Sequence, residues 1–120
     1  MTSLELPHTH VNLRKTAHLR EQLNAAGTFD SVAALLGLMA DTSRVRIFWL
    51  LCHGEECVIN LSAMMEMSSP AVSHHLKILR SAGLIESRRE GKEVYYKAAH
   101  TPAVQMLHIT IENIMHITCP

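Results

Sequence analysis

The sequence predicts a mainly α fold that carries one β-hairpin, and a stretch near residue 80 decides this prediction. In residues 68–83, Val72, Leu76 and Leu79 recur at i, i+4 and i+7, the period of a helix with one buried face. Residues 84–97 follow directly with two β-type runs around a glycine-containing turn. A helix-turn-helix followed by a hairpin is a winged helix-turn-helix, and we expect this architecture.

Local signals define the ends of these elements. Ser68 and Ser69 are favourable helix N-caps, and Pro70 suits a first turn, where its missing N–H costs nothing. Gly83 suits the C-terminal end of the helix. The hairpin has two expected strands and a turn, at residues 84–89, 93–97 and 90–92.

N-cap residues and apolar periodicity predict the rest of the chain. The expected caps include Asp30, Asp41, Asn60 and Thr101. Further helices are expected at residues 11–26, 31–39, 44–52, 61–67 and 101–117, with an extended piece at 57–59 and the helix-turn-helix turn at 67–69. Residues 1–10 are expected to form a flexible N-terminal arm, and residues 11–120 one winged helix-turn-helix domain.

Composition limits the classes of function. The 120 residues carry no net charge, which argues against a strongly electrostatic nucleic-acid binder, yet basic residues gather between 77 and 97. Three cysteines at irregular spacing are not a disulfide framework and fit a reducing cytoplasm. We see no signal peptide and no apolar run near the ~20 residues of a membrane span, so we expect a cytoplasmic protein without membrane contact.

Polar residues on the helix at 68–83 and cations on the hairpin predict a DNA-binding surface. Short hydroxyl groups, imidazoles and cations are the groups that reach base edges and phosphates. The expected DNA-binding residues are Ser69, Ser73, His74, His75, Lys77, Arg80, Arg88, Arg89 and Lys92. The alternative is that the histidines are ordinary surface residues and the hairpin cations only solubilise it.

Three motifs in order, ADTSRVRIFWLL, EECVINLS and SSPAVSHHLKILRSAGLIESRREGKEVYY, resemble the ArsR/SmtB family of metal-responsive bacterial repressors. The resemblance runs from about Phe29 to the C-terminus. It implies a homodimer, formed through the first and last helices, that binds an inverted-repeat operator in double-stranded DNA. It also implies that the protein releases this DNA when an effector binds.

The resemblance places one sensor site on the last helix. The matching positions here are His100, Pro102, Asn113 and His116, of which only the two histidines are ordinary metal ligands. The sequence offers a further set on one helical face, because His108, Glu112 and His116 stand at i, i+4 and i+8. Two imidazoles and a carboxylate suit zinc, cobalt or nickel.

These residues flank an apolar stripe that we expect to be the dimer seam, formed by Val104, Leu107, Ile111 and Met115. A metal site there would bridge the subunits. The alternative is that the set consists of polar residues at the edge of the seam.

The resemblance places a second sensor site before the helix-turn-helix. The family pattern E-L-C-V-C-D-L appears as residues 55–61, where Cys57 matches the first cysteine and Ile59 replaces the second. In related sensors the N-terminal arm of the other subunit completes this site. Here that arm supplies His8, His10 and His18, and with Cys57 they suit zinc but not arsenic or lead. The alternative is a buried Cys57 and a solvated arm.

Other functions remain open at this point. Thiol oxidation or reactive sulfur would act through Cys52, Cys57 or Cys119, although their spacing matches no family pattern that we know. A winged helix that binds only protein is consistent with the zero net charge. The sequence shows no Gly-rich phosphate loop, metalloprotease motif or nucleophile elbow, so we expect no enzyme. We therefore predict a repressor that leaves its operator on binding a divalent metal, zinc first, with cobalt or nickel as alternatives.

Overall fold

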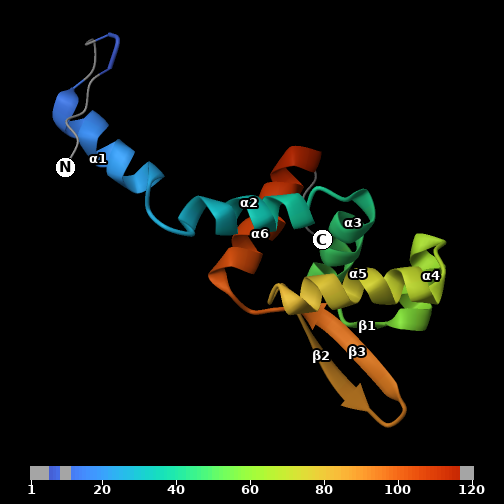
Figure 1. Ribbon diagram of the computed structural model, residues 1–120. Coiled ribbons are helices and arrows are strands. Elements are labelled where there is room, and N and C mark those ends of the chain that lie inside the picture. The colour runs from blue at the N-terminus through green and yellow to red at the C-terminus, as the bar shows by residue number, and fades with distance from the viewer. Residues whose placement is uncertain (1–5, 9–11, 117–120) are drawn as a thin grey trace. The chain divides into compact units, whose positions relative to one another are not determined.

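A computed structural model describes residues 6–8 and 12–116, and its elements are shown in Figure 1. The chain divides into two compact units, residues 1–34 and residues 35–120. The first unit contains α1 (Leu13–Leu23) and the beginning of α2 (Thr28–Leu38). No helix in the described part of the chain combines the length and apolar character that crossing a membrane requires.

Two boundaries in the first unit differ from those predicted. The first helix starts after Asn12, whose side-chain oxygen accepts hydrogen bonds from the N–H groups of Arg14 (2.9 Å) and Lys15 (3.3 Å). The second starts at Thr28, so Asp30 lies in its first turn and is not the N-cap. A carboxylate is favourable at either place, because both face the positive end of the helix dipole.

The second unit is a winged helix-turn-helix, as predicted. Three helices precede and form the helix-turn-helix, α3 (Thr42–His53), α4 (Val58–Met65) and α5 (Ser69–Ser81). A short strand β1 (Glu56–Cys57) separates α3 from α4, and the wing consists of β2 (Ile85–Glu90) and β3 (Glu93–Ala98). The sheet is antiparallel in the order β1-β3-β2, and α6 (Pro102–Met115) follows it.

Caps account for most of the helix starts. Asp41, Ser68 and Thr101 each accept a hydrogen bond from a first-turn N–H group, at 3.0, 3.3 and 3.2 Å. These three predicted caps are confirmed. Gly91 has φ +62° at the first central position of the two-residue hairpin turn, where glycine is favoured.

The prediction around α4 was wrong. We expected residues 57–59 to be extended and Asn60 to cap the helix, but α4 begins at Val58. The Asn60 amide instead donates to Glu56 Oε2 at 2.9 Å. Pairing of Glu56 and Cys57 with β3 ends the extended segment there, so the chain enters the helix earlier. The helix also ends earlier, since Glu66 is left-handed at φ +54°, which moves the turn to residues 66–68.

The core of this unit lies between α3 and the helix-turn-helix. Ile47 and Phe48 of α3 are fully buried against the stripe Val72, Leu76 and Leu79 of α5. Burial of one such side chain stabilises the fold by about 1.5–3 kcal/mol. The predicted buried face of α5 is thereby confirmed, and its opposite face is left to solvent.

Helix α6 corrects the expected dimer seam. Val104 is buried, and Leu107 and Ile111 pack against the same core, so three of the four stripe residues face the interior of their own unit. Large apolar side chains lie on other faces of α6, with Met106, Ile109 and Ile114 at 69%, 59% and 72% exposure. Helical periodicity finds an apolar face but does not say whether the same chain or a second chain covers it.

Substitution of Thr101 by alanine tests the role of the α6 cap. Loss of the acceptor for the Val104 N–H should cost about 1 kcal/mol of unfolding free energy. Thr101→Ser keeps the acceptor and should retain most of the stability. The measurement is thermal unfolding at one fixed protein concentration, because any association between chains would make the melting temperature depend on concentration. Equal melting temperatures for the two variants would contradict the assignment.

Candidate DNA-binding surface and metal centre

The exposed face of α5 carries the side chains predicted to meet DNA. Ser69, Ser73, His74, Lys77 and Arg80 are all exposed. The face exists because the opposite stripe of α5 is held against α3, while α4 packs beside it to complete the helix-turn-helix. Hydroxyl groups and cations thus lie along one side of a fixed helix, the arrangement that reaching into a major groove requires.

His75 lies apart from this exposed face. Its side chain is half-buried, and its Nδ1 lies 3.3 Å from Nη1 of Arg44 in α3. The Arg44 guanidinium also donates to the carbonyl oxygen of Leu38 at 2.7 Å. Since a guanidinium has no acceptor, Nδ1 of His75 must accept in this contact. His75 therefore contacts α3 in this structure, and its contact with DNA stays a prediction.

The three wing cations that were predicted to contact DNA are not equivalent. Arg88 donates to both carboxylate oxygens of Glu55 (2.7 and 2.8 Å) and to Glu90 (2.7 Å), and it lies 4.9 Å from the ring centre of Tyr95. Of these three cations, Arg89 and Lys92 are exposed, while two carboxylates neutralise Arg88.

The contact of Arg88 with Glu55 shifts both groups in the direction expected of an ion pair. The hydrogen bond from Arg88 lowers the pKa of Glu55, and the hydrogen bonds from Glu55 and Glu90 raise the pKa of Arg88. The pair ties β2 to the loop after α3, so it attaches the wing to the segment that follows this helix.

Helix α5 and the wing share one surface. A hollow beside α5 is lined by Ser73, Lys77, Arg80 and Ser81 of that helix and by Tyr96 of β3. Two cations of α5 therefore face a space bounded by the sheet. A phosphate backbone that follows α5 would meet cations from both elements.

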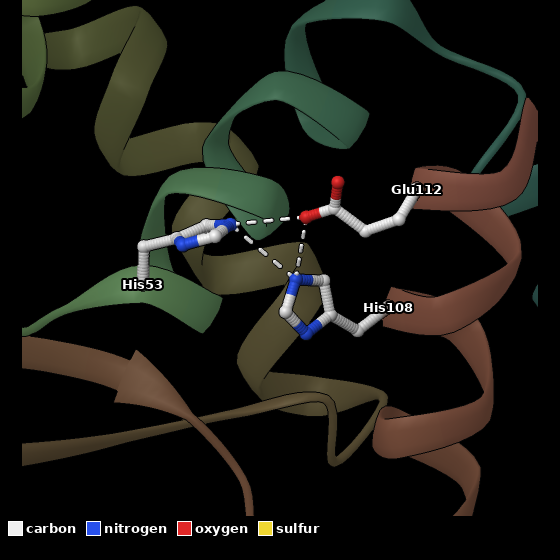
Figure 2. A group of neighbouring side chains, drawn as sticks. All are labelled: His53, His108 and Glu112. Carbon is white, nitrogen blue, oxygen red and sulfur yellow. Dashed lines mark hydrogen bonds and ion pairs between the residues drawn. The ribbon is translucent and has the colours of Figure 1, made fainter. Parts of the chain in front are cut away.

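A second group of polar side chains lies where the C-terminal end of α3 meets α6 (Figure 2). His53 Nε2 and His108 Nε2 lie 3.1 and 3.0 Å from the same oxygen, Oε1 of Glu112, and 3.4 Å from each other. The side chains of the two histidines are 20% and 21% exposed, and that of Glu112 is 9% exposed. Three potential metal ligands thus converge on one point.

A tryptophan supports this group from α3. Trp49 Nε1–H donates to Glu112 Oε1 at 2.9 Å, and the Trp49 ring lies 4.4 Å from the ring of His53, centre to centre. Trp49 and His53 are one helical turn apart, as are His108 and Glu112. Each pair therefore lies on one face of its helix, and the two faces meet.

The donor set fits a divalent transition metal. Two imidazole nitrogens and one carboxylate oxygen are ligands of zinc and its neighbours. Tetrahedral ligands at ~2.0–2.1 Å from a metal lie about 3.3 Å apart, close to the separations within this group. When bound, such a metal supplies a positive charge that links α3 to α6.

Among the predicted metal ligands that lie in the described residues, the structure brings two together. His108 and Glu112 share the group with His53, whereas His116 is the exposed, left-handed C-cap of α6, and His100 is an exposed residue before it. The helical face assumed for His116 ends at Met115, because the backbone changes direction at the cap.

The described residues of the second predicted site belong to two different units of the chain. His8 and His18 belong to the first unit, and His18 is exposed on α1. Cys57 belongs to the second unit, half-buried in β1, and His10 lies outside the described residues. This site stays a prediction.

His53 was missed by the sequence analysis. It ends an apolar helix, where a histidine is an ordinary C-terminal residue, and its partners are 55 and 59 positions away. No local spacing connects it to α6. A helical wheel of α3 with His53 and Trp49 on one face was the one available signal.

Comparison with known proteins identifies the family. Residues 41–87 match the model of the bacterial regulatory proteins of the arsR family. A transcriptional repressor SmtB homolog of Synechocystis sp. is 37% identical over 104 residues, which cover 87% of this chain and 79% of that protein. The chain belongs to the arsR family.

Further relatives agree with this assignment. A cadmium resistance transcriptional regulatory protein CadC homolog of Staphylococcus aureus is 34% identical over 73% of each chain. The structure of HlyU from Vibrio cholerae superposes with a TM-score of 0.68 at 29% identity, covering 74% of this chain and 96% of that one. The arsR-family chain is therefore a winged-helix DNA-binding transcriptional regulator and not an enzyme, as predicted.

Replacement of Arg89 by glutamine tests the exposed wing cations. A dimer would lose two phosphate contacts, so the slope of log affinity against log salt should become shallower by about 1.8, at ~0.9 per contact. Arg89→Lys keeps the charge and should keep the slope. The measurement is operator affinity over a series of salt concentrations, and an unchanged slope for Arg89→Gln would remove Arg89 from the contact surface.

The ion pair between Arg88 and Glu55 gives a pH-dependent prediction. Because Arg88 lowers the pKa of Glu55, the pair should stabilise the fold above the ordinary carboxyl pKa of about 4.3 and lose this effect as pH falls through the lower, folded value. NMR titration of the Glu55 carboxyl group should give a pKa below about 4.3. Arg88→Gln should return it to the ordinary range, and an unchanged pKa in that variant would contradict the pairing.

Proposed function

We propose that this regulator is a cytoplasmic, homodimeric repressor that binds an inverted-repeat operator and leaves it when a divalent transition metal binds. The observation that carries the proposal is the pairing of an exposed, cation-bearing α5 with a cluster of three metal-type ligands in the same unit. The first feature supplies DNA recognition and the second supplies a site for the effector.

The DNA-binding part rests on the distribution of charge. The chain has no net charge, yet Lys77, Arg80, Arg89 and Lys92 are exposed on α5 and the wing. Phosphate contacts depend on such local cations and not on the overall balance. Ser69, Ser73 and His74 are exposed on α5 and are the proposed contacts to base edges.

The homodimer is supported by apolar surface that one chain leaves uncovered. On α6, Met106, Ile109 and Ile114 are more than half exposed, and α2 presents Phe29 and Leu36 at 51% and 59% exposure. Exposed apolar residues in such numbers favour association with another surface. Two-fold symmetry would place two α5 helices about one DNA turn apart, which matches an inverted repeat.

The effector class rests on the donor set and on the named functions of relatives. Imidazole and carboxylate ligands favour zinc, with cobalt and nickel as alternatives. The Staphylococcus relative is named for cadmium resistance. For the alternative of thiol oxidation, Cys52 and Cys57 are half-buried, and Cys119 lies outside the described residues.

The proposed mechanism is differential affinity. Metal favours the dimer conformation in which the two α5 helices no longer match successive major grooves. The packing of α5 on α3 would then pass a displacement of α3 to the DNA-binding helix. Coupling of this kind is commonly about 1–3 kcal/mol and reciprocal, so DNA should weaken metal binding by the same factor.

Fluorescence anisotropy of labelled operator DNA tests the proposal. Reduced, chelator-treated protein should bind the operator tightly, and Zn(II), Co(II) or Ni(II) should lower its affinity by about 5–150-fold. A thiol oxidant, added in the absence of metal, is the parallel arm. Release by the oxidant alone would replace the metal with a redox effector. An operator affinity that does not fall as salt is added would refute binding through cation–phosphate contacts.

A further inference from the structure

We propose that His53, His108 and Glu112 of a single subunit form a divalent transition metal site, with Trp49 as the residue that positions Glu112. The ligands come from the end of α3 and from one face of α6 (Figure 2). Each subunit would hold its own metal without a ligand from its partner. The regulatory consequence rests on the proposed function, whereas metal binding itself does not.

The first argument is the convergence of the donor atoms. His53 Nε2, His108 Nε2 and Glu112 Oε1 are separated from one another by 3.0–3.4 Å. A purely hydrogen-bonded arrangement asks one carboxylate oxygen to accept from both imidazoles and from the Trp49 indole. It also places two imidazole N–H groups against each other at 3.4 Å. Deprotonated Nε2 atoms directed at a shared cation remove both difficulties.

The second argument is the rigidity of the supports. His53 follows the buried residues Phe48 and Leu51 on α3, and Glu112 follows Ile111, which packs on the same core. Each ligand therefore extends from a helix whose other face is fixed. Trp49 then orients the carboxylate through its hydrogen bond to Oε1. Ligands on rigid helices, held by an outer hydrogen bond, are the usual construction of a metal site.

The third argument is access. A hollow of about 360 Å³ lies beside the group, and both histidines line it together with Cys52 and Gln105. The two imidazoles are about one-fifth exposed. Three protein ligands with one side open leave a coordination position for water, and the metal can enter and leave from solvent.

The position of this site connects it to the wing. His53 is the last residue of α3, and Glu55, two residues later, holds Arg88 of β2. A metal that joins His53 to α6 would thus act on α3, against which α5 packs, and on the loop that anchors the wing. Under the proposed function, occupation of each subunit's site shifts both DNA-contacting elements.

Titration of chelator-treated, full-length dimer with Co(II) tests the site without DNA. Visible d–d absorption reports the coordination, and fluorescence reports proximity, because Trp49 is the single tryptophan of the chain. We expect one Co(II) per subunit, with absorption bands of four-coordinate cobalt and a fluorescence change over the same titration. Absorption typical of octahedral aqueous cobalt, or saturation without a fluorescence change, would overturn the proposal.

Variants separate this site from the one that the family resemblance implies. His53→Gln and His108→Gln should each weaken Co(II) binding by about tenfold or more, since loss even of an outer partner costs about 10–100-fold. His100→Gln and His116→Gln are the matched controls and should bind cobalt as the parent does. Loss of binding in the controls with retention in His53→Gln would overturn the proposal. Far-UV circular dichroism excludes a loss of binding through unfolding.

Trp49→Phe tests the positioning role. It removes the hydrogen bond to Glu112 while keeping an aromatic ring beside His53. Co(II) affinity should fall by about 10–100-fold, with altered d–d bands. A merely structural role would change the melting temperature and leave the cobalt spectrum as it was, which would refute positioning.

Operator anisotropy with the same variants distinguishes this inference from the proposed function. If His53→Gln binds DNA but no longer responds to metal, both stand. If it still responds fully, the regulator is metal-responsive through other residues and this site fails as the sensor. If cobalt binds as expected yet the parent protein keeps its DNA affinity, the site stands and the proposed regulation fails.

Discussion

The packing of α3 against α5 is the interaction on which the rest of this structure depends. Ile47 and Phe48 are fully buried there with Val72, Leu76 and Leu79. Helix α3 also contacts α4, β3 and α6, and β2 is joined to it through β3 and α5. The surfaces proposed for DNA and metal are therefore built on elements that this helix holds in place.

The fold also explains how a neutral protein can belong to a DNA-binding family. The chain has equal numbers of acidic and basic residues, but the fold distributes them unequally. Glu55 and Glu90 form ion pairs with Arg88 of the wing, whereas Lys77, Arg80 and Arg89 remain open to solvent. The field that a phosphate experiences is local within a Debye length of about 8–10 Å, so arrangement matters more than net charge.

The sequence predicted what depends on local rules. Caps at Asp41, Ser68 and Thr101 and the buried stripe of α5 follow from short-range chemistry, and the structure confirms them. The predicted start of α4 was wrong because pairing between β1 and β3, nearly forty residues apart in sequence, decides where the extended segment ends. His53 was missed for the same reason, since its partners lie on another helix.

The apolar stripe of α6 shows a different limit. Periodicity correctly located Val104, Leu107 and Ile111 on one face, yet the prediction assigned that face to a second subunit. An amphipathic pattern gives the direction of burial relative to the helix axis and nothing about the covering surface. Only the positions of the other helices show that these residues belong to the interior of their own unit.

Helix α6 consequently has different surroundings on three faces. One face completes the core through Val104, another directs His108 and Glu112 at α3, and a third exposes Met106 and Ile109. Each residue of an α-helix advances by about 100°, so a single inserted or deleted residue would turn all three faces away from their surroundings at once. Point substitutions at one face can be absorbed separately, but changes in length cannot. Length variation in relatives should therefore concentrate before Thr101 or beyond Met115, outside the helix.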